Sequence, residues 1–163
     1  MISTDTLPPD ALLTRYAQRD GCYTDCYSTQ IDRSADLTEF VMAFYTTRLF
    51  RCERFVLAHM LKRPSNDVEA LDFASGKINQ FAAWDLEERT GTQLLACDLS
   101  HATRSWFMVK QERAGTKLYF GSVVTPKQGK TLGLMMTLAL PLHRLYSRLL
   151  LSAARNRLNQ GQY

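Results

Sequence analysis

"GLMMTLALPLHRLYSRLLLSAARNRL", residues 133–158, is the stretch that decides the fold, because it could form a membrane anchor, a nucleic-acid-binding helix or the covering helix of a folded core. Its uncharged part, residues 132–142, is only about half as long as the roughly 20 residues that cross a bilayer. His143 and Arg144 end that part. The sequence therefore excludes an integral membrane segment at this position.

The rest of this stretch has the pattern of an amphipathic helix. Its expected apolar stripe consists of Leu142, Leu145, Leu149 and Ala153, flanked by Tyr146 and Leu150, and its arginines at 144, 148 and 155 lie on the opposite side. Pro141 marks either a kink or the first turn of the main helix. We expect the stripe to cover a sheet, with binding to a membrane surface as the alternative.

Length and composition indicate one folded domain. The chain has 163 residues, of which 45% are hydrophobic and 22% are charged. Its net charge of +4 comes from basic and acidic residues that are mixed along the chain, and its aromatic residues lie within apolar runs. We therefore expect no nucleic-acid binding. We divide the chain into an exposed N-terminal tail, residues 1–20, and a single domain, residues 21–160.

The N-terminal residues lack the cationic start and apolar region of a signal peptide, so we expect a cytoplasmic protein with reduced cysteines. Cys22 and Cys26 lie on a predicted strand, where four residues span about 13 Å, too far for two ligands of one ion. No nucleophile elbow, phosphate loop or dinucleotide fingerprint is present. We therefore predict neither a metal nor a cofactor.

The predicted elements indicate an α+β fold with an antiparallel sheet. Asp36 and Glu39 form a capping-box pair at the start of one helix, and residues 49–61 form a second. A short helix over residues 65–76 also fits the pattern. Five strands are expected at residues 23–31, 77–88, 92–99, 103–112 and 116–124. This order predicts a curved sheet of about five strands that grips the long C-terminal helix, with a helix pair after the first strand.

Apolar side chains are expected on both faces of this sheet. Alternation places Trp106 and Met108 on one face, and Phe107 and Val109 on the other. Either the sheet curls around an interior, or its second face contacts another subunit. Aromatic residues in strands ordinarily form part of a core. A sheet that grips a helix also commonly leaves an apolar pocket.

Glu53 is the acidic residue that departs from its surroundings. It falls on an expected apolar stripe with Leu49, Val56 and Met60. A carboxylate there costs free energy unless it is paired. We expect Arg104 or His143 to be its partner. Glu53 is then either half of a structural ion pair or a carboxyl that faces a pocket and has a raised pKa.

Several segments resemble a known family. They are "FRCERFVLAHML", "FAAWDLEER", "TRSWFMV", "TKLYFGSVV" and "PLHRLYSRLLLSAA". Over residues 23–158 the chain resembles the helix-grip architecture of the START and Bet v 1-like (SRPBCC) superfamily, and within it an uncharacterised bacterial domain family with "ER", "W", "RSW", "LYFGS" and "HR-Y" landmarks. The resemblance implies a cavity for apolar small molecules between the sheet and the last helix, although we predict fewer strands than the full fold has.

The predicted function is the binding of an apolar or amphipathic small molecule. The predicted ligand-binding residues are the aromatic residues Trp84, Trp106, Tyr119 and Tyr146 and the polar anchors Glu53, Arg104 and His143. One alternative is a small cyclase-like or hydrolase-like enzyme with Glu53 or His143 as general acid or base. Another is a homodimeric interaction protein without a cavity. The sequence assigns no catalytic residue.

Overall fold

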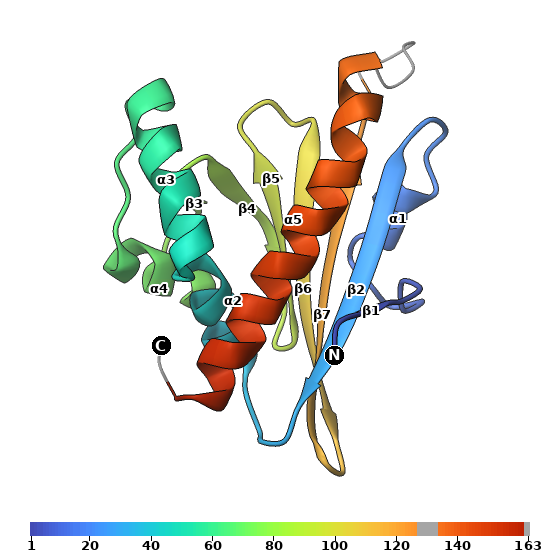
Figure 1. Cartoon of the computed structure of the whole chain (residues 1–163), viewed down its shortest axis with the longest axis vertical. Coiled ribbons are helices and arrows are strands. Elements are labelled where there is room, and N and C mark those ends of the chain that lie inside the picture. Colours follow the sequence, from blue (N-terminus) through green and yellow to red (C-terminus); the bar gives the residue numbers. More distant parts are fainter. Residues whose placement is uncertain (127–133, 162–163) are drawn as a thin grey trace.

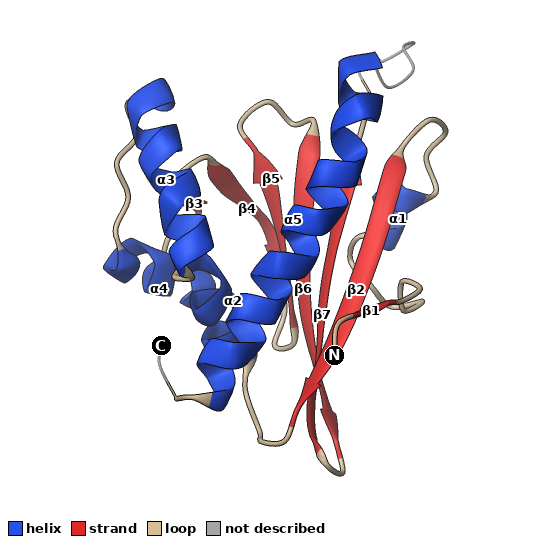
Figure 2. Cartoon of the chain, viewed as in Figure 1, coloured by secondary structure: helices blue, strands red, loops and turns tan. Residues whose placement is uncertain are grey.

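The computed structural model describes residues 1–126 and 134–161 and has an α+β fold (Figures 1 and 2). A curved antiparallel sheet of seven strands carries the longer helices on one face and the N-terminal segment, with a short helix, on the other. The elements in chain order are β1 (Ser3–Thr4), α1 (Thr14–Ala17), β2 (Tyr23–Ile31), α2 (Leu37–Tyr45), α3 (Arg48–Leu61), α4 (Asp67–Ser75), β3 (Gln80–Phe81), β4 (Trp84–Arg89), β5 (Gln93–Asp98), β6 (Thr103–Glu112), β7 (Gly115–Val124) and α5 (Leu134–Asn159).

The strands follow the order β1-β2-β7-β6-β5-β4-β3. The prediction of five strands is wrong by two short strands. β1 pairs with β2 through residues that we assigned to the tail, and the single strand predicted over residues 77–88 is a hairpin, β3 and β4. The hairpin turns at Ala82, whose φ of 52° is left-handed. Alanine rarely adopts this conformation, so the sequence carries no turn signal there.

Three helices follow β2, where we predicted a pair. The predicted capping box of α2 is confirmed, since Asp36 accepts from the Glu39 amide and Glu39 accepts from the Asp36 amide. Asn66 and Glu69 form the same arrangement at the start of α4. Both boxes satisfy amide groups that the first helical turn leaves without partners. The short helix that the sequence pattern also allowed is therefore a full element of the fold.

The larger core lies between the helices and one face of the sheet. α5 runs diagonally across this face, beside α2 (Figure 1). The ring of Phe44 on α2 lies 4.9 Å from that of Phe107 on β6 and 4.7 Å from that of Phe120 on β7. Aromatic pairs at such distances contribute stability beyond their buried area. The expected alternation is confirmed, because Phe107 is in this core and Trp106 is in a separate cluster on the opposite face.

The N-terminal segment covers the second face of the sheet. Leu13 is 0% exposed and packs in a cluster with Trp106. A side chain on Gly121 would have its Cβ 3.1 Å from the Trp106 ring and 3.2 Å from Leu13, so the glycine allows this close packing. Our expectation of an exposed tail over residues 1–20 is therefore wrong. The apolar outer face needs a cover, and this chain supplies it from its own first residues.

A glutamine joins this N-terminal segment to the sheet. The side-chain oxygen of Gln93 accepts from the indole of Trp106 at 2.8 Å and from the amide of Leu12 at 3.0 Å, and its nitrogen donates to the carbonyl of Asp10. These bonds satisfy polar groups that burial would otherwise leave without partners. They also fix the segment's register on the sheet.

α5 presents the opposite apolar stripe to the one we expected. Leu142, Leu145 and Leu149 are 70%, 55% and 49% exposed, whereas the buried positions are Ser147, Leu150, Leu151, Ala154 and Leu158. Both sets have helical spacing, so periodicity alone does not choose between them. Ser147 and Ala154 are small and let the helix approach the sheet closely. The helix also continues through Pro141, so this proline does not begin it.

No helix in the described part of the chain is long and apolar enough to cross a membrane.

Replacing Leu13 with Ala tests the cover on the outer face. We expect the free energy of unfolding to fall by roughly 2–5 kcal/mol, because the change leaves a cavity against Trp106 and Gly121. Urea denaturation measures the loss. Leu7→Ala is the control, because Leu7 is only partly buried in the same cluster and loses less area. Equal stability of Leu13→Ala and the wild type would contradict the packing.

A pair of substitutions on α5 tests its orientation. Leu151→Ala should destabilise by roughly 2–5 kcal/mol because Leu151 is 0% exposed. Leu145→Ala should change stability by only about 0.5 kcal/mol because Leu145 faces outward. Thermal and urea unfolding of the two variants give the comparison. The stripe expected from the sequence predicts the reverse order.

Candidate functional site: a cavity between α3 and α5

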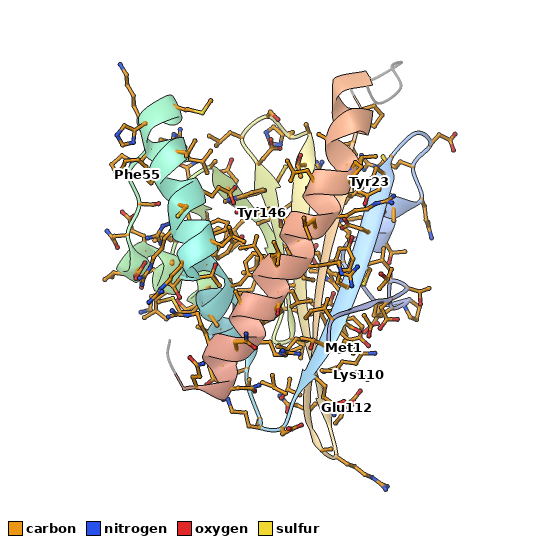
Figure 3. All side chains as sticks on the ribbon, in the orientation of Figure 1. Met1, Tyr23, Phe55, Lys110, Glu112 and Tyr146 are labelled. Carbon is orange, nitrogen blue, oxygen red and sulfur yellow. The ribbon has the colours of Figure 1, made fainter. Side chains whose placement is uncertain are left out.

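A cavity of about 390 Å³ lies between α3 and α5, above the strands of the sheet. Figure 3 shows Tyr146 in the space between these two helices. The volume falls in the range of small-molecule sites. The lining is mainly apolar and aromatic: Phe44, Tyr45, Phe50, Leu57, Ala83, Trp84, Leu99, Phe120, Tyr146 and Leu150, with the polar residues Glu53, Asp98, Ser100, Thr103, Ser105, His143 and Ser147.

Glu53 projects into this cavity from α3 and accepts a hydrogen bond from the Tyr146 hydroxyl on α5. Burial raises the pKa of the Glu53 carboxyl, and the Tyr146 bond opposes part of that rise. Tyr146 therefore takes the place of the partners expected from the sequence, Arg104 and His143. The expected stripe on α3 is also wrong, since Val56 and Met60 are exposed and Glu53 faces inward with Phe50 and Leu57.

Two further polar atoms at the cavity have no partner among the described residues. They are the Tyr45 hydroxyl and the indole nitrogen of Trp84, each buried and without a hydrogen bond. Tyr45 is 1% exposed, so its hydroxyl lies inside the fold. A buried polar group without a partner costs free energy. Such groups beside a cavity indicate that a bound molecule can supply the missing partners.

His143 links the cavity to a buried carboxylate. Its Nε2 lies 2.8 Å from the Ser122 hydroxyl and 3.6 Å from Asp25. The Ser122 hydroxyl donates to Asp25 at 2.7 Å, and the Ser122 amide donates to the same carboxylate oxygen at 3.0 Å. Because the hydroxyl donates to Asp25, it accepts from His143 Nε2–H. His143 thus lines the cavity while Ser122 and Asp25 fix its ring.

The cavity brings together two groups that exchange protons. Glu53 on α3 and His143 on α5 both line it. Carboxyl and imidazole groups are side chains that serve as general acids and bases in proteins. Both groups can therefore act on the same bound molecule.

Three of the predicted ligand-binding residues lie elsewhere. Trp106 and Tyr119 are buried on the opposite face of the sheet, among residues packed by the N-terminal segment. Their rings are 6.2 Å apart. Strand alternation in the sequence places Trp106 and Phe107 on opposite faces of the sheet. It does not show which of these two faces the helices cover. Glu53, Trp84, His143 and Tyr146 are the predicted residues that the structure brings to one cavity.

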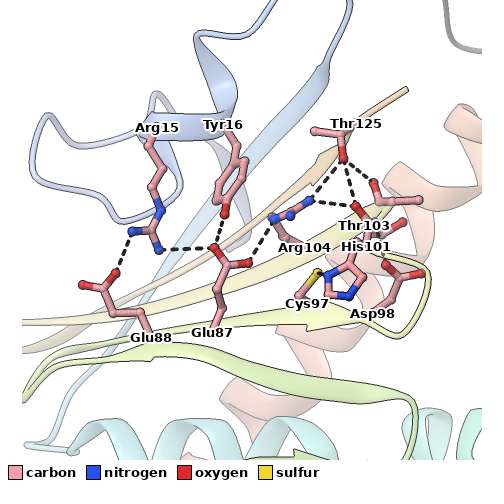
Figure 4. Close-up of polar contacts among 11 residues, drawn as sticks. Arg15, Tyr16, Glu87, Glu88, Cys97, Asp98, His101, Thr103, Arg104 and Thr125 are labelled. Atoms are coloured by element: carbon pink, nitrogen blue, oxygen red, sulfur yellow. Dashed lines mark hydrogen bonds and ion pairs between the residues drawn. The ribbon is translucent and has the colours of Figure 1, made fainter. Parts of the chain in front are cut away.

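Arg104 belongs to a polar cluster on the outer face (Figure 4). It donates to Glu87 at 3.0 Å, and its guanidinium lies 4.0 Å from the centre of the Tyr16 ring. The hydroxyl of Tyr16 donates to Glu87 as well, and Arg15 pairs with Glu88 at 2.7 Å. Cation–π contacts and charge-assisted bonds of this kind stabilise packed surfaces. Arg104 therefore holds the N-terminal segment to the sheet and does not contact the cavity.

Sequence reasoning missed Tyr45, Asp25 and Ser122. Tyr45 is the last residue of α2, where the apolar pattern ends, so it resembled an ordinary core residue. Asp25 stands within a strand rich in Tyr, Thr and Ser. An acidic residue inside a strand is the signal that could have singled it out, because burial of a carboxylate requires several donors.

No protein-family model matches the chain, and no curated protein matches it significantly. Among the described residues, no group of three or more His, Cys, Asp or Glu side chains could hold a metal ion.

Replacing Glu53 with Gln tests the electrostatics of the cavity. Because the folded pKa of Glu53 is raised, its stabilising contribution is complete below the ordinary value of 4.5 and is lost as the pH rises through the folded pKa. Gln does not titrate. The stability of the variant relative to the wild type should therefore increase as the pH rises from below 4.5 to neutral.

Urea denaturation over this pH range measures the difference. Glu112→Gln, at an exposed position at the end of β6, is the matched control and removes the same charge. If the stability of Glu53→Gln relative to the wild type does not change with pH, Glu53 does not have a raised pKa.

Proposed function

We propose that this protein binds an apolar or amphipathic small molecule in the cavity between the sheet, α3 and α5. The observation that carries the proposal is the cavity of about 390 Å³, whose lining is mostly aromatic and aliphatic. Removing an apolar ligand from water into such a lining contributes roughly 25 cal/mol per Å² of buried apolar surface. A few polar groups at fixed positions then orient the ligand.

The polar groups of the cavity support the same conclusion. The unpartnered Tyr45 hydroxyl and Trp84 indole nitrogen offer hydrogen bonds that the fold does not use. Satisfying a buried donor recovers free energy that the empty site loses. A ligand with polar atoms at one end and apolar surface elsewhere fits this lining.

The arrangement also agrees with the helix-grip resemblance of the sequence. A long C-terminal helix over a curved antiparallel sheet, with a cavity beneath it, is what that resemblance implies. The argument for binding rests on the cavity itself, because fold alone does not establish function.

Binding of the neutral fluorescent probe N-phenylnaphthylamine tests this proposal. We expect saturable fluorescence enhancement with the wild type. Ser147→Phe should weaken binding by about tenfold or more, because Ser147 is buried on α5 and lines the cavity, and a phenyl ring there fills the space. Fluorescence titration gives the two dissociation constants.

Ser152→Phe is the matched control, because the same change on α5 lies outside the cavity lining and is half-buried. Circular dichroism establishes that both variants are folded. No saturable binding by the wild type, or equal binding by folded Ser147→Phe, would exclude the cavity as the binding site.

A further inference from the structure

The charges at the cavity restrict what can bind there. Its lining contains two carboxyl groups, Glu53 and Asp98, and among its described residues no lysine or arginine. His143 is the remaining ionisable base, and its ring is already engaged with Ser122 and Asp25. An anionic head group would therefore find no permanent cation among the described lining residues to pair with it.

The two carboxyl groups are not equivalent. Asp98 accepts hydrogen bonds from the Thr103 amide at 2.9 Å and from the Ser100 hydroxyl, so its own loop satisfies it. Glu53 accepts from the neutral hydroxyl of Tyr146, and none of the ion pairs among the described residues includes it. Glu53 is thus a half-buried carboxyl without a cationic partner among the described residues. Such a group is stabilised most strongly by a cation that donates a hydrogen bond to it.

Aromatic rings line the same cavity as this carboxyl. Tyr45, Phe50, Trp84 and Tyr146 belong to the lining, and the rings of Tyr45 and Phe50 lie 4.7 Å apart. The face of an aromatic ring attracts an ammonium group, and the attraction increases when water is excluded. A carboxyl together with several aromatic rings is therefore a favourable environment for an amine.

We infer that the cavity is selective for an amine-bearing apolar molecule, whose ammonium group pairs with Glu53 and contacts the surrounding aromatic rings. The inference rests on the proposed function, since it specifies the ligand class of the same cavity. Entry of the ammonium supplies the cation that Glu53 lacks, while the apolar remainder of the ligand contacts Leu57, Leu150 and Phe120. The Tyr45 hydroxyl can accept a further hydrogen bond from the ammonium, because no described residue occupies it.

Three ligands of equal chain length separate charge from hydrophobic burial. Decylamine, decanol and decanoate compete with N-phenylnaphthylamine at neutral pH, below the concentrations at which they aggregate. We expect decylamine to bind about tenfold tighter than decanol, because a charge-assisted hydrogen bond replaces a neutral one. Decanoate should bind about tenfold weaker than decanol, because the described lining offers its charge no lysine or arginine.

Glu53→Gln identifies the residue that sets this order. The variant should bind decylamine no more tightly than decanol, and circular dichroism checks that it is folded. Glu112→Gln removes the same charge from an exposed position and should keep the full preference for the amine. This control separates pairing at Glu53 from the effect of net charge.

The outcomes distinguish this inference from the proposed function. If neither the probe nor decanol binds the wild type, the proposed function is wrong, and the inferred preference for amines is wrong with it. If decanol binds and decanoate binds as tightly as decylamine, the cavity binds apolar molecules but the inferred amine selectivity is wrong. An amine preference that survives unchanged in Glu53→Gln would overturn the role of that carboxyl.

Discussion

The apolar character of both faces of the β6–β7 pair is the constraint on which the rest of this structure depends. Phe107 and Phe120 project toward the helices, while Trp106 and Val123 project from the other face. An antiparallel sheet with one solvent-exposed face needs other elements to pack on its apolar face only. Both faces of this sheet are apolar, so each must be packed against another part of the chain. α2 and α5 cover the first face, and the N-terminal segment covers the second, fixed by the bonds of Gln93.

The cavity follows from how the first cover is built. α3 lies apart from α5 at one end of the sheet (Figure 1). Phe44 and Tyr45 of α2 line the cavity between these two helices. Glu53 and Tyr146 meet across this space, so the two helices contact each other through a polar pair where a core would place apolar side chains. Removing this carboxyl from water costs free energy that the single bond from Tyr146 offsets only in part. Its position at a cavity is better explained by ligand binding, as we propose.

The candidate site was partly predictable. Glu53, Trp84, His143 and Tyr146 line one cavity, and the first of these was singled out because a carboxyl on an apolar helix departs from the ordinary pattern. Trp106 was misplaced for a physical reason: strand alternation separates neighbouring residues onto two faces but does not identify which face meets the helices. Tyr45 carried no signal, because a tyrosine at the end of an apolar helix is typical of a core.

The sequence by itself determined the elements that depend on local chemistry: the capping box of Asp36 and Glu39, the long strands of the meander, and the existence of an amphipathic C-terminal helix. Tertiary structure decided which side of each helix is buried. α5 carries two apolar stripes, and packing on the sheet buries the one with Leu151 and exposes the one with Leu145. Periodicity fixes the direction of a side chain relative to its own helix, whereas burial depends on the shape of the surface that the helix meets.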